Sequence, residues 1–346
     1  MKTSNLYREI HSQPEVLAKM IAAESAHIPQ IVAKLKQRDV SYLMFAARGT
    51  SDNAALYGKY AFSVMAGVPV ALAEPSVYTL YHQPPRLKNT ALIAISQSGE
   101  STDILAVLEE ARRQGTPTIA ITNRPDSAMA NLADETILLH AGEEKAVAAT
   151  KTYTTSLMAM ALLAAAWNGD PARLDEARRI PEAVAAALTN EAQAQAIGES
   201  LYHLNACTVI GRGFNYSTAH ELSLKLKELA YVRAEPYSPA DFLHGPVAIV
   251  DSQAHVIVFG PRGATYDNIV EFAQNIRGRG GRVFAISDGA ELLGLARAGI
   301  QLPPMPEWLS PVTAIVPGQL LAMALTQAKG YDLDHPRGLT KVTLTM

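Results

Sequence analysis

Short apolar runs alternate along the chain with longer segments in which apolar residues recur every three or four positions. The short runs are almost continuously apolar, which is typical of parallel strands covered by helices on both faces. This alternation predicts an α/β fold with doubly wound, flavodoxin-like parallel sheets. The predicted strands are 42–47, 68–73, 91–96, 118–122, 135–140, 207–211, 255–259, 282–287 and 299–302. The predicted helices are 52–66, 102–114, 127–132, 150–167, 216–231, 266–279 and 311–329.

Three junctions between a predicted strand and the following loop occur twice, at an almost constant offset. The first set is 47–50, 93–99 and 120–123, and the second set is 211–214, 257–263 and 285–288. The chain is therefore predicted to contain two copies of one α/β unit. We expect an N-terminal helical segment (1–38), a first domain (39–170), a helical connector (171–204), a second domain (205–332) and a C-terminal tail (333–346).

The composition is that of a soluble globular protein, with 48% apolar and 18% charged residues. With a net charge of −3 the chain has no excess of basic residues that would attract anionic surfaces. Neither nucleic acid nor a membrane is therefore expected as a partner. The one cysteine, Cys207, cannot form an internal disulfide, and no signal peptide is evident, so we expect a cytoplasmic protein. The histidines lack metal-ligand spacing and the Gly211–Gly213 turn is a weak dinucleotide signal, so no metal and no cofactor are expected.

The loop after the third predicted strand is rich in hydroxyl groups. Ser96, Ser98 and Ser101 supply donors, Gly99 lets a ligand approach the backbone, and the next helix begins with free N–H groups. These features suit a phosphomonoester, and a loop of similar chemistry (48–51) follows the first strand. The alternative is an ordinary N-cap cluster that only satisfies the amides of the helix.

The helix predicted over 216–231 carries Glu221, Lys225 and Glu228 on one stripe, so each carboxylate can reach the lysine. His244 follows in a loop rich in helix breakers, where a histidine can titrate. A glutamate, a lysine and a histidine together can move protons around a carbonyl. The alternative is a solvated ladder of ion pairs, which such spacing most often means.

The last eight residues alternate in polarity and are expected to be ordered, and Lys341 is the cation among them. A desolvated amine there could form a Schiff base with a sugar carbonyl. The alternative is an ordinary surface lysine on a terminal tail.

Several motifs in order resemble the SIS (sugar isomerase) domain family, and especially the isomerase half of the glucosamine-6-phosphate synthases, which are glutamine–fructose-6-phosphate aminotransferases. The resemblance covers nearly the whole chain and implies two tandem SIS domains. The motifs are REIHSQP (8–14), RGTSDN (48–53), SQSGESTD (96–103), ATKTYTT (149–155), KLKE (225–228), LHGP (243–246) and HPR (335–337) with Lys341.

The resemblance implies a role for each matching residue. Glu228 would move the proton between C1 and C2, with Lys225 assisting it. His244 would assist ring opening and would be donated across a homodimer interface. Lys341, in the tail that completes the active site, would engage the open-chain carbonyl as an imine-forming amine. The residues implied to bind the sugar phosphate are Thr50, Ser51, Ser96, Gln97, Ser98, Ser101 and Val147.

Departures from the family pattern shape the expected function. The synthases begin with a glutaminase domain that this sequence lacks, so glutamine is not expected as the direct nitrogen source. Ala149, Leu243 and Thr340 replace family residues and leave the substrate open. We expect an amino-sugar phosphate isomerase and deaminase that converts glucosamine 6-phosphate to fructose 6-phosphate and ammonia. The alternatives are a fructosamine-phosphate deglycase, a galactosamine-phosphate deaminase, ammonia-dependent glucosamine 6-phosphate synthesis, or a non-catalytic sugar-phosphate sensor.

Overall fold

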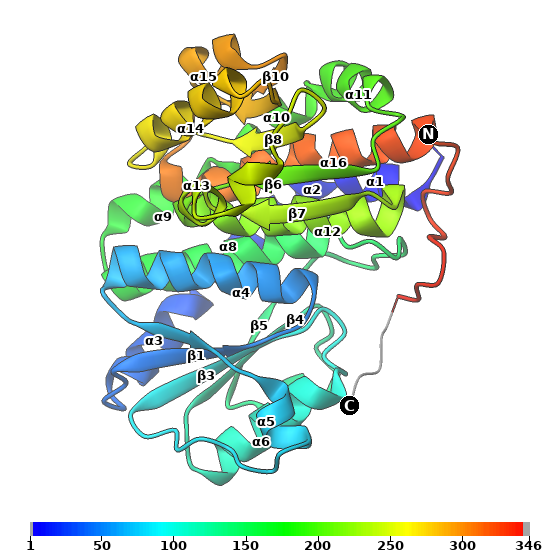
Figure 1. The fold of residues 1–346 in the computed structure, drawn as a ribbon. Coiled ribbons are helices and arrows are strands. Elements are labelled where there is room, and N and C mark those ends of the chain that lie inside the picture. The colour runs from blue at the N-terminus through cyan, green and yellow to red at the C-terminus, as the bar shows by residue number, and fades with distance from the viewer. Residues whose placement is uncertain (1–2, 342–346) are drawn as a thin grey trace. The chain divides into compact units, whose positions relative to one another are not determined.

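The computed structural model describes residues 3–341 and forms two compact units, each built around one five-stranded parallel sheet (Figure 1). The first-sheet unit contains 15–144, 151–178 and 340–341. The second-sheet unit contains 3–14, 145–150 and 179–339. Each unit therefore takes short segments from outside its main stretch of chain. Residues 342–346, part of the segment predicted to be ordered, lie outside the described residues.

The first sheet has the strand order β2-β1-β3-β4-β5, which is the flavodoxin-like order. Its central strands are fully buried, as near-continuous apolar runs predict. α4 covers one face and packs against α8, while α5 and α6 cover the other face (Figure 1). The strands are β1 (Tyr42–Ala46), β2 (Val70–Leu72), β3 (Thr90–Ile95), β4 (Thr118–Thr122) and β5 (Glu135–Leu138). The helices are α2 (Gln13–Glu24), α3 (His27–Lys36), α4 (Thr50–Ala61) with a π-helical turn at Phe62–Ala66, α5 (Pro75–Thr79), α6 (Thr102–Arg113), α7 (Ala128–Leu132), α8 (Lys151–Asn168) and α9 (Pro171–Arg178).

The second sheet repeats this topology, with the order β10-β9-β8-β6-β7. α12 packs against α16 and the sheet, and α14 packs against α15. The strands are β6 (Ala206–Ile210), β7 (Arg233–Tyr237), β8 (His255–Phe259), β9 (Arg282–Ser287) and β10 (Ala298–Gln301). The helices are α1 (Asn5–His11), α10 (Ile180–Leu188), α11 (Glu191–Ser200), α12 (Tyr216–Ala230), α13 (Pro239–Leu243), α14 (Tyr266–Gly278), α15 (Ala290–Leu295) and α16 (Ser310–Ala328), with 3₁₀ turns at Gly213–Asn215, Pro246–Ile249 and Glu307–Leu309.

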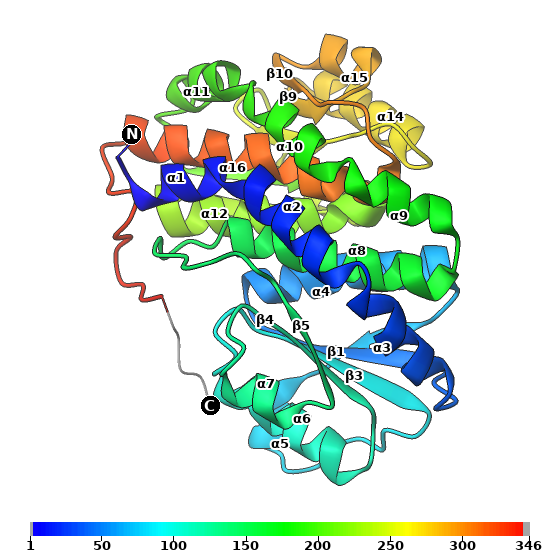
Figure 2. The ribbon, with the colours of Figure 1, turned by 180° about the vertical axis from the view of Figure 1, so that it is seen from behind.

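The predicted fold class, two flavodoxin-like parallel sheets flanked by helices, is confirmed. The edge strand β7 was not predicted, because its sequence RAEPY contains two charged residues and a proline and alternates only partly between buried and exposed positions. The segment Glu307–Ala328 is long and apolar enough to cross a membrane, but it is buried inside the protein. α16 packs against α1, α10, α11 and α12, as α1 and α16 show side by side in Figure 2, so its apolar character is that of a core helix.

Candidate functional site

The serine-rich loop between β3 and α6 gathers three hydroxyl groups. The Ser96 Oγ lies 3.1 Å from the Ser101 Oγ and 3.5 Å from the Ser98 Oγ. Ser101 occupies the N-cap position of α6, yet its side chain makes no capping hydrogen bond to the helix. The ordinary N-cap interpretation is therefore wrong for Ser101. Three converging hydroxyls above a twelve-residue helix N-terminus can bind an anion.

Glycine is required at the turn of this loop. Gly99 has φ +68°, and a Cβ there would come within 2.2 Å of the Ser127 Oγ. The Gly99 amide donates to the Ser96 Oγ at 3.2 Å, and the Glu100 amide donates to the Ser98 Oγ at 3.3 Å. The loop is thus held in one shape by its own backbone, with the serine oxygens gathered together.

An ion pair between a half-exposed arginine and a buried aspartate joins this loop to the one after β1. The Arg48 Nε donates to the Asp103 carboxylate at 2.6 Å, and Asp103 is almost fully buried. Arg48 lies just before Thr50 and Ser51, which open α4, and Asp103 lies in the first turn of α6. The pair therefore ties together the two helix starts that carry the predicted phosphate-binding residues.

A cavity of about 450 Å³ in the first-sheet unit joins the serine-rich loop to the C-terminal tail. Gln97 and Ser98 line it from the loop, and Lys341 lines it from the tail. Three residues predicted for the site are therefore brought together. The lining residues that the sequence reasoning missed are Asn123, Arg124, Gly142, Glu143 and Glu144.

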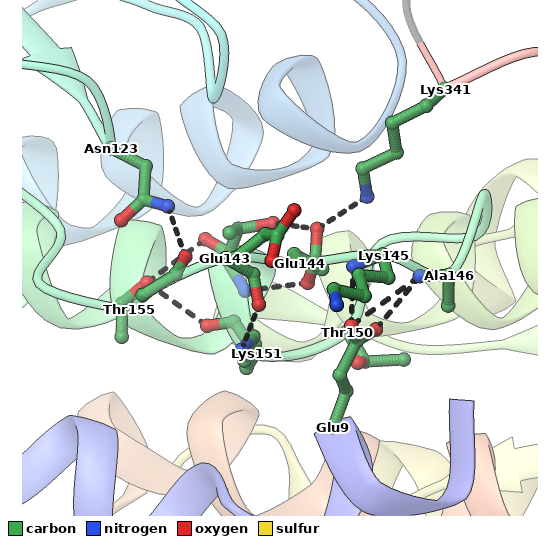
Figure 3. A network of polar contacts seen from close by, with 12 residues as sticks. Glu9, Asn123, Glu143, Glu144, Lys145, Ala146, Thr150, Lys151, Thr155 and Lys341 are labelled. Carbon is green, nitrogen blue, oxygen red and sulfur yellow. Dashed lines mark hydrogen bonds and ion pairs between the residues drawn. The ribbon is translucent and has the colours of Figure 1, made fainter. Parts of the chain in front are cut away.

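Glu144 fixes the position of Lys341. The Lys341 Nζ donates to the Glu144 carboxylate at 2.8 Å (Figure 3). That carboxylate also accepts from the Thr152 amide at 3.1 Å and from the Thr152 Oγ1 at 2.8 Å. The Glu144 side chain is fully buried, whereas that of Lys341 is 25% exposed. Lys341 is therefore not a free surface lysine. An imine could form only after its Nζ leaves Glu144 and gives up a proton.

Two further hydrogen bonds hold the 142–144 loop that lines the cavity. The Asn123 Nδ2 donates to the Gly142 carbonyl, and the Lys151 Nζ donates to the Glu143 carbonyl, both at 2.7 Å. Figure 3 shows both side chains pointing at the loop. Lys151 belongs to the ATKTYTT motif, so this residue of the motif contributes to the cavity indirectly, by holding the 142–144 loop.

The 145–150 segment, which carries Val147, belongs to the second-sheet unit. The Glu9 carboxylate of α1 accepts hydrogen bonds from the Lys145 and Ala146 amides (Figure 3). Val147 itself is half-buried. Because Glu9 lies in the REIHSQP motif, the N-terminal helix positions the segment that the resemblance assigns to sugar binding.

The Glu221–Lys225–Glu228 stripe of α12 is buried rather than solvated. The Lys225 Nζ lies 3.3 Å from the Glu221 carboxylate and 2.6 Å from that of Glu228. Lys225 and Glu221 are almost inaccessible, and Glu228 is 23% exposed. Burial alone would lower the pKa of Lys225, but the two carboxylates outweigh it and raise that pKa above its ordinary value. Lys225 is thus a fixed cation, and Glu228 is the member of the group that solvent can reach.

His244 is exposed at the end of α13, next to the exposed Leu243. Within residues 3–341 its imidazole makes no hydrogen bond. The ring is therefore available to a ligand or to another protein chain. Over the same part of the chain, no group of three or more His, Cys, Asp or Glu side chains is arranged for a metal ion. Cys207 is buried, and burial raises the pKa of its thiol to about 12.

The second sheet has no open counterpart of the serine-rich loop. The corresponding loop, 260–265, donates hydrogen bonds from the Ala264 amide (2.7 Å) and the Thr265 Oγ1 (2.8 Å) to the Glu307 carboxylate. A Cβ on Gly263 would come within 2.3 Å of that side chain. An internal carboxylate therefore fills the anion position of the second copy, and the first copy keeps its position open.

Comparison with known proteins agrees with this geometry. The family model described as "SIS domain" matches residues 38–166 and 200–327. A glutamine–fructose-6-phosphate aminotransferase (isomerizing) from Pyrococcus horikoshii is 36% identical over 342 residues, which cover 97% of this chain and 57% of that relative. The chain thus spans little more than half the length of the relatives it matches.

Solved structures share the fold over nearly the whole chain. A candidate phosphosugar isomerase from Silicibacter pomeroyi is 32% identical with a TM-score of 0.88, covering 96% of this chain and 100% of that one. The C-terminal domain of glucosamine-fructose-6-phosphate aminotransferase from Francisella tularensis is 27% identical with a TM-score of 0.88, covering 96% and 98%. With two matched regions that account for most of its length, the chain belongs to the SIS domain family.

Proposed function

We propose that the chain is a sugar-phosphate isomerase that acts on an amino sugar and releases ammonia. The substrate would be glucosamine 6-phosphate and the products fructose 6-phosphate and ammonia. The observation that carries the proposal is the cavity that Gln97 and Ser98 share with Lys341. This one space is large enough for a small ligand, and the proposal takes Gln97 and Ser98 as donors to the phosphate and Lys341 as the amine that would meet the carbonyl.

The serine-rich loop would hold the phosphate through neutral donors, namely the Ser96, Ser98 and Ser101 hydroxyls at the start of α6. Thr50 and Ser51 would add donors from the neighbouring helix start that Arg48 ties in place. This part of the site fixes the substrate and leaves the chemistry at C1 and C2 to other residues.

Glu228 would carry the proton in the isomerisation. In the open-chain aldose it takes the hydrogen from C2 as a proton and returns a proton to C1, while a proton from nitrogen passes to O1. The resulting C2 imine adds water and expels ammonia, which leaves the ketose. The 2.6 Å hydrogen bond from Lys225 would orient the Glu228 carboxylate for this step.

His244 would open the sugar ring before this transfer. Its exposed position and lack of a hydrogen-bonding partner within residues 3–341 support donation of the imidazole to a second copy of the chain. The functional unit would then be a homodimer.

A rate measurement with a matched pair of variants tests the proposal. Glu228→Gln should reduce ammonia release from glucosamine 6-phosphate by about 10²-fold or more, because the proton carrier is lost. Glu182→Gln removes an exposed carboxylate from α10 and should leave the rate unchanged. Equal rates for Glu228→Gln and the wild type would contradict the assignment of Glu228. Binding of the sugar phosphate without any release of ammonia would indicate a sensor.

Arg124 favours a second candidate substrate. Its guanidinium lines the same cavity and is 62% exposed, with one ion pair to the exposed Asp126 at 3.5 Å. A guanidinium can pair bidentately with a carboxylate, as a 6-phosphofructosyl amino acid would present. A panel of this compound, galactosamine 6-phosphate and glucosamine 6-phosphate separates the candidates. If the deglycase function holds, Arg124→Gln should raise the KM for the glycated amino acid alone.

A further inference from the structure

A second hollow, of about 290 Å³, lies in the second-sheet unit at the amino-terminal ends of β9 and β10. These ends are opposite to the loop edge where ligands of parallel sheets normally bind. We call it the arginine hollow, because three of its eight lining residues are arginines and none is acidic. It is lined by Arg277, Gly280, Gly281, Arg282, Val283, Leu295, Ala296 and Arg297.

Arg282 is fixed in place at this hollow. It is half-buried at the start of β9, its Nη2 donates to the Gln253 Oε1 at 2.9 Å, and its Nη1 lies 3.5 Å from the His255 Nε2. Neither partner carries a negative charge, and the positive charge of the arginine is therefore not compensated by them. A pre-positioned guanidinium loses little side-chain entropy when an anion binds.

The other two arginines approach from different elements. Arg277 lies in the last turn of α14 and Arg297 just before β10, and both are exposed (Figure 1 shows α14 and β10). Within residues 3–341 none of the three arginines forms an ion pair. Like charges gathered around one space repel each other, and a bound anion would remove that repulsion.

The field at the neighbouring histidine agrees with this arrangement. Burial lowers the pKa of His255, and Arg282 and, to a smaller extent, Arg297 lower it further. Both guanidinium groups therefore disfavour a positive charge on the same ring, in agreement with their common place at the hollow.

We propose that the arginine hollow binds a small phosphorylated anion, at a site separate from the serine-rich loop. Guanidinium forks match the geometry of phosphate oxygens, which explains three arginines in one place. Val283, Leu295 and Ala296 form an apolar wall for the organic part of the ligand. The volume suits a phosphorylated compound of about the size of a sugar phosphate.

Titration calorimetry with inorganic pyrophosphate tests this site. Sorbitol 6-phosphate is added first at saturation, so that the serine-rich loop is occupied. Arg277→Gln/Arg297→Gln removes two charges from the hollow. The control, Arg86→Gln/Arg179→Gln, removes two exposed arginine charges that are not in an ion pair within residues 3–341 and do not line the hollow.

The wild type and the control should bind one pyrophosphate per chain with equal affinity, and the hollow variant should bind about tenfold more weakly or not at all. Ser98→Ala should leave the binding of pyrophosphate unchanged. This result distinguishes the arginine hollow from the proposed substrate site, so that either proposal can fail without the other. Absence of binding to the wild type would overturn the proposal, as would equal weakening in both double variants. A single-stranded oligonucleotide that binds the wild type more tightly than pyrophosphate would overturn the small-anion assignment.

Discussion

At the scale of single residues, buried charges mark the candidate site. Lys225 lies between two carboxylates, Glu144 accepts from Lys341, and Asp103 accepts from Arg48. Each of these three buried charges has a partner of opposite sign, since an unpaired buried charge is very costly. These pairs hold functional groups at defined positions, and their loss should affect stability as well as activity.

Lys225→Met should lower the free energy of unfolding by about 3–5 kcal/mol, because two carboxylates would be left side by side without their cation. Urea denaturation followed by circular dichroism measures this change. Lys227→Met, which removes an exposed lysine from the same helix, should change stability by less than about 0.5 kcal/mol. Comparable losses in the two variants would contradict the buried-cation account.

The pH dependence of this effect follows from the sign of the shift. The folded-state pKa of Lys225 lies above its unfolded value, so its stabilising contribution is fully present below the unfolded pKa of about 10.4. The contribution is lost only as pH rises through the higher folded-state pKa. The difference in stability between the wild type and Lys225→Met should therefore stay constant between about pH 7 and 9.

At the scale of elements, the serine-rich loop depends on Gly99. Gly99→Ala should lower the free energy of unfolding by about 1–3 kcal/mol and weaken sorbitol 6-phosphate binding, because the new Cβ would collide with Ser127 and displace the serines. Gly115→Ala is the matched control, since Gly115 also has positive φ (+73°) but open space around it. It should lose stability through strain alone and keep its binding. Unchanged binding by Gly99→Ala would contradict the role of the loop geometry.

Strands and loops differ in how well the sequence predicts them. Strongly apolar strands such as β4 and β8 matched their predicted limits, because burial on both faces leaves a continuous apolar run. β7 was missed because an edge strand needs few apolar residues. The hydroxyl-rich loop was identified from its residues, but the failure of Ser101 to cap α6 depends on side-chain rotamers that no spacing reveals.

The sequence pattern also could not predict the role of site residues whose partners lie far away along the chain. Glu144 pairs with Lys341 across 197 positions, and Glu9 holds the Lys145 amide across 136. Neither carboxylate stands near a recognisable catalytic spacing. Their roles follow from burial and from the contacts they make, which tertiary packing determines.

At the scale of the whole molecule, two copies of one topology have taken different forms. The first copy keeps an open loop with three hydroxyls, whereas Glu307 fills the corresponding loop of the second copy. The second copy instead carries Glu228 on α12 and His244 at the end of α13. A repeat detected in the sequence predicts equal folds, but only the side chains show that the copies have different chemistry.

The most direct test of the central claim is the stoichiometry of the reaction. Purified wild-type protein is incubated with glucosamine 6-phosphate alone, and ammonia and fructose 6-phosphate are measured in the same samples over time. Isomerisation with loss of the amino group predicts that the two products appear together in a ratio of about one to one. The absence of ammonia, or ammonia without fructose 6-phosphate, would contradict the proposed function.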